Sequence, residues 1–192
     1  EKAVDAEVKA AETEKINAEN AVRDAAGRKA QAEADQAKVN TEQDKVITDK
    51  TKEKTDYEAD LKSVKDTIRE QEKKKADAEK IIDELENKGI LNLETAEIDK
   101  AKAMSEAKVG EWSWSLLRKV TQADIDNANA TIKKYNDAKA DKKNAETELT
   151  DKKAEKAELE KKISTAQSAI NTANKTKQDA AEATDAAQKS LD

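Results

Sequence analysis

The side chains of this chain that could take part in chemistry are almost all carboxylates and amines. Its 192 residues include 43 Asp or Glu and 37 Lys or Arg, but no His and no Cys. Without imidazoles or thiols, the chain offers no ordinary zinc, haem or iron–sulfur ligands, no His-based triad and no cysteine nucleophile. The carboxylates show no spacing that marks a paired catalytic site. We therefore expect no enzymatic activity, no catalytic or metal-binding residues and no cofactor.

Recognition by aromatic side chains is concentrated in one short stretch. Trp112 and Trp114 are the only tryptophans, both lie in the sequence GEWSWSLL, and the chain contains no Phe. Alternate residues of a strand share one face, so the two indole rings would lie together. Trp is among the residues that dominate binding at protein interfaces. This stretch is the main candidate for contact with a partner.

The residues on both sides of this stretch predict long helices. Charged residues make up 42% of the chain and aromatic residues 2%, a composition typical of coiled coils but also of disorder. Periodicity decides for helices, because apolar residues recur at alternating steps of three and four. The first seam consists of Val4, Val8, Ala11, Ala18, Val22, Ala25, Ala32, Val39 and Val46, then, after a one-residue slip, of Tyr57, Leu61, Val64, Ile68, Gln71, Lys75, Ala78, Ile82 and Leu85. The second seam begins at Ile125, Ala128, Ile132 and Tyr135 and continues from Leu149 to Leu191.

Local signals indicate where the first helix ends. The sequence LENKGI fits a Schellman motif with Gly89 as its left-handed residue. This motif requires a hydrophobic contact across the helix end, here between Leu85 and Ile90.

The start of the second helix has an equally clear signature in VTQADI. Thr121 is predicted as the N-cap and Asp124 as its capping-box partner, while Val120 and Ile125 are placed to form a hydrophobic staple.

The chain therefore divides into a first helix at 1–88, a tip insert at 89–120 and a second helix at 121–192. We predict an all-α fold, a long antiparallel two-helix coiled-coil hairpin with a small structured tip. A turn centred in the insert would bring Val39 near Ile170 and leave about seventeen N-terminal residues without a partner helix.

Within the insert, a short helix starting at the cap residue Asn92 and ending at Gly110 is expected, followed by an extended EWSWSLL segment. One Trp ring could close the hairpin in a small apolar core, leaving the other near the surface. The other candidate members of this core are Ile90, Leu91, Leu93, Ile98, Met104, Leu116 and Leu117. Structured loops of about thirty residues usually carry function. The predicted partner-binding residues are Trp112, Trp114, Leu116, Leu117, Ile90, Leu91 and Met104.

In architecture the chain resembles the receptor-binding domain of colicin-type bacteriocins. The resemblance rests on the arm sequences ADAEKIIDELENKG and SAINTANKTKQDAAEATDAAQKSLD and on the GEWSWSLL tip. It implies a non-enzymatic, secreted or cell-surface recognition module that presents its tip to a protein receptor, an outer-membrane protein of a target bacterium. The absence of an initiator Met and of a signal-like segment indicates a piece of a larger protein.

Two alternatives stay open. The acidic arms, rich in Lys, Ala and Glu, also suit a stalk or adhesin segment of a Gram-positive surface protein, and a cytoplasmic coiled-coil scaffold is the third interpretation. The net charge of −6 argues against nucleic acid as the main partner. No three consecutive residues are apolar, so we expect no membrane insertion. A monomer or weak dimer is expected.

Overall fold

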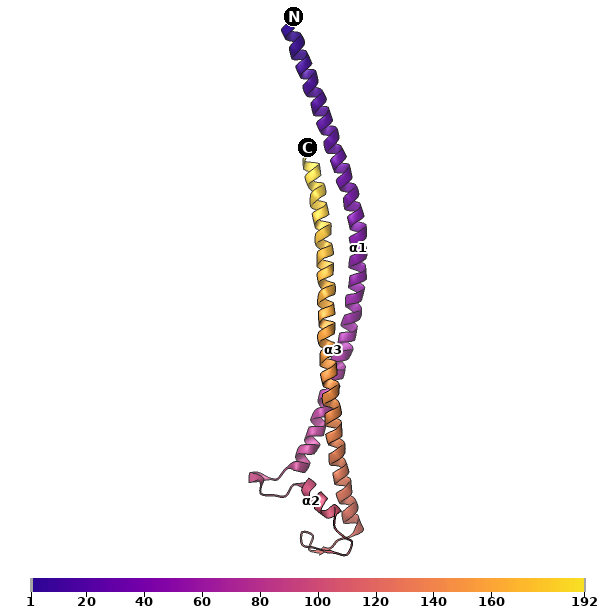
Figure 1. The fold of residues 1–192 in the computed structure, drawn as a ribbon, viewed down its shortest axis with the longest axis vertical. Helices are drawn as coiled ribbons and strands as arrows, with labels where there is room; N and C mark the ends of the chain where they lie inside the picture. Colours follow the sequence, from indigo (N-terminus) through magenta and orange to yellow (C-terminus); the bar gives the residue numbers. More distant parts are fainter. Residues whose placement is uncertain (1, 192) are drawn as a thin grey trace. The chain divides into compact units, whose positions relative to one another are not determined.

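The fold consists of two long helices joined by a small mixed segment, the tip. The computed structural model describes residues 2–191. Its elements in chain order are α1 (Lys2–Glu86), the 3-10 helix η1 (Ile90–Asn92), α2 (Glu97–Ser105), β1 (Trp112–Ser113), β2 (Arg118–Lys119) and α3 (Gln122–Lys189). α1 and α3 pack against each other in antiparallel directions (Figure 1), which confirms the predicted all-α hairpin. Within the described part of the chain, no helix combines the length and the apolarity needed to cross a membrane.

The chain forms two compact units, and both long helices contribute to each. Unit 1 consists of Glu1–Ala59 with Leu159–Asp192, and unit 2 consists of Asp60–Glu158, which includes the whole tip.

The predicted seams are confirmed over most of their length. All the seam residues named from Tyr57 to Leu85 in α1, and from Ile125 to Leu191 in α3, are buried or half-buried. Between Ala25 and Leu85, Val46 is the one named seam residue that is exposed, at 37%, and Ile47 takes the half-buried position instead. The slip in phase therefore lies earlier than predicted, before Ile47.

The register between α1 and α3 differs from the predicted one. In unit 1, Asp44 forms an ion pair with Lys177, about three helical turns farther along α3 than the predicted register allows. Lys54 likewise donates a hydrogen bond to the side chain of Gln167. The expected proximity of Val39 and Ile170 was therefore wrong.

The cause of the shift lies in unit 2, where α2 occupies the place that the end of α1 was expected to fill. Ala96 and Ile98, at the start of α2, form a buried cluster with Tyr135 of α3, and Ile82 and Leu85 of α1 pack against it. α1 consequently ends beside Tyr135 rather than beside the first turn of α3.

The shifted register leaves a longer unpaired segment at the start of α1 than predicted. Every residue from 3 to 24 is exposed, whereas an overhang of about seventeen residues was expected. The predicted seam residues Val4, Val8 and Val22 are 60%, 51% and 59% exposed. α1 thus extends past the C-terminal end of α3 within unit 1 (Figure 1).

Candidate recognition surface

The tip is anchored at the start of α3 by the predicted capping box. The backbone N–H of Asp124 donates to Thr121 Oγ1 at 3.3 Å, and Asp124 Oδ2 accepts from the Thr121 N–H at 2.7 Å. Val120, which precedes the cap, is 4% exposed, and Ile125 is half-buried. The reciprocal bonds satisfy backbone groups that a helix N-terminus otherwise leaves open, so α3 has a well-defined first residue.

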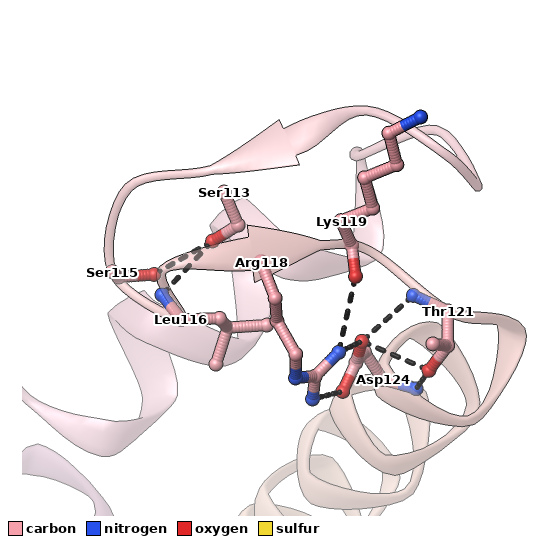
Figure 2. Close-up of polar contacts among 7 residues, drawn as sticks. All are labelled: Ser113, Ser115, Leu116, Arg118, Lys119, Thr121 and Asp124. Carbon is pink, nitrogen blue, oxygen red and sulfur yellow. Dashed lines mark hydrogen bonds and ion pairs between the residues drawn. The ribbon is translucent and has the colours of Figure 1, made fainter.

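A guanidinium group from β2 completes this anchor, as Figure 2 shows. Arg118 Nη1 and Nη2 each lie 2.7 Å from one carboxylate oxygen of Asp124, and Nη1 also donates to the carbonyl of Lys119. The Asp124 side chain is only 14% exposed. Hydrogen bonds from Arg118, followed by those from Thr121, hold the pKa of Asp124 well below its usual range. The hairpin is therefore fastened to α3 by a two-point ionic contact.

The Trp-containing stretch forms a β-hairpin rather than an isolated extended segment. Trp112 pairs with Lys119 and Ser113 with Arg118, and residues 114–117 form the turn. At the base of the hairpin, the Gly110 N–H donates to the Val120 carbonyl. The Val120 N–H in turn donates to the carbonyl of Glu111, the residue after Gly110. Two residues thus oppose one, as in a glycine bulge.

This bulge changes the predicted role of Gly110. Its φ of 84° suits the left-handed position of the bulge, and α2 already ends at Ser105. The prediction that Gly110 ends the short helix was therefore wrong.

The two tryptophans both lie at the surface, in mutual contact. Their ring centroids are 6.1 Å apart and the planes make an angle of 76°, an edge-to-face arrangement. Trp112 is 51% exposed and Trp114, which belongs to the turn, is 82% exposed. Neither ring closes the hairpin as a core residue.

The predicted apolar core at the tip was wrong except for Ile98. Tyr135, Ile132 and the end of α1 surround Ile98, because α2 packs between the two long helices. Met104 is half-buried. The remaining candidates are exposed, and they are Ile90 (87%), Leu91 (80%), Leu93 (80%), Leu116 (36%) and Leu117 (72%).

The loop after α1 also departs from its prediction. Gly89 has φ 72° and ψ −166°, which is outside the left-handed helical region, and its N–H donates to Asn87 Oδ1 at 2.9 Å. With Ile90 exposed, the Schellman contact to Leu85 is absent. The Glu94 N–H closes the loop by donating to the Lys88 carbonyl at 2.7 Å.

The start of α2 was also predicted too early. Asn92 has φ 56° and lies in this loop, so it caps nothing, and α2 instead follows Ala96 at its N-cap. Ala96 is 1% exposed, and burying it in the cluster around Tyr135 fixes where the helix begins.

A groove of about 910 Å³ lies between α2, the hairpin and the first turns of α3. Met104, Trp112 and Leu116 contribute large apolar side chains to its lining. Its lining also contains one ammonium group, that of Lys100, and five carboxylates, those of Glu97, Asp99, Glu106, Glu111 and Asp124. The groove therefore combines apolar surface with excess negative charge.

The predicted site residues fall into two groups. The structure brings Met104, Trp112 and Leu116 together at the groove, and Trp114 contacts Trp112 beside it. Ile90 and Leu91 belong to η1 and Leu117 belongs to the hairpin turn, and none of these three lines the groove.

No pattern in the sequence predicted that Arg118 positions the hairpin. Its contact with Asp124 joins a strand to a helix cap, and no periodic pattern marks such a pair. A signal existed only for Asp124, through the capping box.

Among residues 2–191, no group of three or more Asp or Glu side chains is placed to hold a metal ion. Comparison of the chain with protein-family models, curated protein sequences and solved structures finds no significant match to any of them.

Proposed function

We propose that this chain is a non-enzymatic recognition module that presents its tip to a protein receptor at a cell surface. The observation that carries the proposal is the exposed pair Trp112 and Trp114 on a hairpin anchored through Arg118 and Asp124. Exposing the apolar surface of two large rings to water is unfavourable, and a partner that covers the rings removes this cost. Because the anchor already restrains the hairpin, its binding costs little additional conformational entropy.

The groove beside the rings supports a particular chemistry for the contact. A receptor segment that inserts an apolar side chain would cover Met104 and Leu116, and a Lys or Arg next to it would meet the surrounding carboxylates. The receptor surface is therefore proposed to be apolar and basic.

The preferred setting is that of a colicin-type bacteriocin, in which the receptor is an outer-membrane protein of a target bacterium. A long helical hairpin with a distinct aromatic tip supports this assignment. The alternative is an adhesin or stalk of a Gram-positive surface protein, which the Lys-, Ala- and Glu-rich acidic arms favour. Both settings place the contact at the same tip.

The test is saturable binding of the fluorescently labelled chain to outer-membrane vesicles from a panel of Gram-negative bacteria. The double variant Trp112→Ser, Trp114→Ser should bind at least tenfold more weakly. Removing a Trp side chain from the centre of an interface typically reduces the binding free energy by about 2 kcal/mol or more. The control variant Val46→Ser removes an exposed apolar side chain from α1 and should bind like the parent. Circular dichroism must show equal helicity for all three proteins.

A second variant pair separates the two apolar surfaces of the tip. Ile90→Ser, Leu91→Ser alters only the loop after α1 and should leave vesicle binding unchanged if the groove and the hairpin make the contact. Equal binding by the parent and the double Trp variant would contradict the proposed site. Binding to Gram-positive cells but not to vesicles would favour the adhesin.

A further inference from the structure

The exposed start of α1 continues the seam by which α1 packs against α3 in unit 1. From residue 3 onward, the first buried residue of α1 is Ala25, which is 4% exposed. Towards the N-terminus from Ala25, the same alternating steps of three and four residues lead to Val22, Ala18, Lys15, Ala11, Val8 and Val4. No described residue covers this stripe, and every side chain in it is exposed. It is therefore an apolar helix face of the same type as the established α1–α3 interface, without its partner helix.

The charges that border this stripe are all of one sign. In a coiled coil, the positions directly flanking the seam meet the flanking positions of the partner helix. Between residues 5 and 26 these positions hold Asp5, Glu7, Glu12, Glu14, Glu19, Ala21 and Ala26. Five of the seven are acidic and none is basic. Glu19 alone among the acids has an ion pair, a 3.8 Å contact with Lys15 of its own helix.

This pattern disfavours a second copy of the chain as the occupant. If two copies paired through this stripe, acidic residues would face acidic residues in either relative orientation. Like charges at these positions destabilise a helix pair and are a common means of excluding a wrong partner.

We propose that residues 3–24 of α1 dock an amphipathic helix whose apolar seam is flanked by Lys or Arg, supplied by another polypeptide segment. In the paired part of unit 1, an acidic residue of α1 likewise meets a lysine of α3, since Asp44 forms an ion pair with Lys177. Lys15, the single charged seam residue in this segment, restricts the register of the incoming helix. The proposal does not depend on the function assigned to the tip, because the two surfaces share no residue.

The test uses the full 192-residue chain and synthetic four-heptad peptides. The first peptide has Val and Leu at its seam positions and Lys at the flanking positions, the second has Glu in place of those Lys residues, and the third is a scramble of the first. Fluorescence anisotropy should show at least tenfold tighter binding of the Lys-flanked peptide than of either other peptide. Hydrogen exchange should show new protection confined to residues 3–24.

A charge-swapped variant makes the assignment specific. Glu7→Lys, Glu12→Lys, Glu14→Lys should reverse the preference, binding the Glu-flanked peptide more tightly than the Lys-flanked one. The control Asp24→Lys, Asp56→Lys, Asp83→Lys changes the net charge equally at exposed positions that do not flank the seam, and it should keep the parent's preference. Because all six side chains are exposed, both variants should fold, which circular dichroism verifies.

Three results would overturn the proposal. One is equal binding of the Lys-flanked peptide and its scramble, since the contact would then be charge attraction without a seam. Another is the absence of measurable binding to any peptide. The third is self-association of the parent chain through residues 3–24 at the concentrations used, which would identify a second copy as the occupant.

Discussion

Asp124 has two functions at the junction between the hairpin and α3. It caps the helix through Thr121, and it holds Arg118 through two 2.7 Å contacts. Since Arg118 belongs to β2, the same carboxylate that starts the helix also positions the strand that pairs with β1. The placement of Trp112 and Trp114 therefore depends on Asp124, a residue of α3 outside the hairpin.

The first prediction concerns the pH dependence of this contact. The pKa of Asp124 is lowered in the folded state, so its ion pair adds stability above the ordinary Asp value of about 4 and loses it as the pH falls through the folded value. Asp124→Asn lacks this titration. The difference in unfolding free energy between parent and variant should be constant above about pH 5 and shrink towards pH 2. Urea unfolding followed by Trp fluorescence measures it, and a pH-independent difference would contradict the role of the carboxylate.

Gly89 provides the second prediction, because its backbone conformation is restricted to glycine. At φ 72° and ψ −166°, a Cβ would lie 2.7 Å from Glu94 Oε2. Gly89→Ala should therefore destabilise the protein by about 1–3 kcal/mol, as measured by chemical unfolding. Gly27→Ala is the opposite control, since Gly27 lies within α1 and the added methyl group would meet nothing within 4 Å apart from its chain neighbours and the helix's own backbone. That variant should gain up to about 1 kcal/mol from helix propensity.

At the level of elements, α2 acts as a substitute for the missing end of α1. Ile98 of α2 packs on Tyr135 and Ile132 of α3, beyond the point where α1 stops at Glu86. Tyr135 connects all three helices. It is 8% exposed, it donates a hydrogen bond to Glu86, and its ring lies 5.8 Å from the ammonium group of Lys102 of α2.

The third prediction separates the two contributions of Tyr135. Tyr135→Phe removes the hydrogen bond to Glu86 but keeps the ring, and it should lower the free energy of unfolding by about 1 kcal/mol. Tyr135→Ala also empties the cluster around Ile98 and should cost about 3–5 kcal/mol. Thermal and urea unfolding give both values. The pKa of Tyr135 is raised, mainly by Glu86, so the contribution of the hydroxyl should persist until the pH exceeds about 10. Equal losses in the two variants would show that the hydroxyl alone stabilises the junction.

At the level of the whole molecule, burial is unevenly divided between the two units. Unit 2 holds most of the buried side chains larger than alanine, namely Val64, Ile98, Val120, Tyr135 and Leu149. In unit 1 the buried residues are Leu159 and three alanines, Ala25, Ala166 and Ala173. Because each buried methylene contributes about 0.8 kcal/mol, alanine seams stabilise a helix pair far less than seams of larger side chains.

The fourth prediction is a gradient of hydrogen-exchange protection that follows this division. Amides of residues 3–24 should exchange fastest, since no partner helix packs against them. Amides of the paired part of unit 1 should be intermediate, and those of α3 around Tyr135 slowest. Mass spectrometry of peptic fragments measures the order. Strong protection of residues 3–24 in the isolated chain at low concentration would contradict it, because that segment has no covering partner in this fold.

The sequence by itself predicted the features that depend on local or periodic signals. The seam steps identified which residues are buried from Tyr57 to Leu85, because helical periodicity alone decides which face is apolar. The capping box at Thr121 was likewise predicted correctly, because its two partners lie only three residues apart. The tip was recognised as a place of concentrated aromatic side chains, although which of them are exposed was not.

Only the tertiary structure decided how the two helices align and what the tip exposes. Weak, alanine-rich seams fit several registers almost equally well, so the packing of Ile98 against Tyr135 set the register. The same packing gave α2 the position expected for the end of α1 and left Ile90, Leu91 and both Trp rings outside the core. The contact of Arg118 with Asp124 depends on where a strand meets a helix, which no periodicity in the sequence encodes. Local patterns thus determined the helices, and long-range packing determined the register, the tip and the exposed segment 3–24.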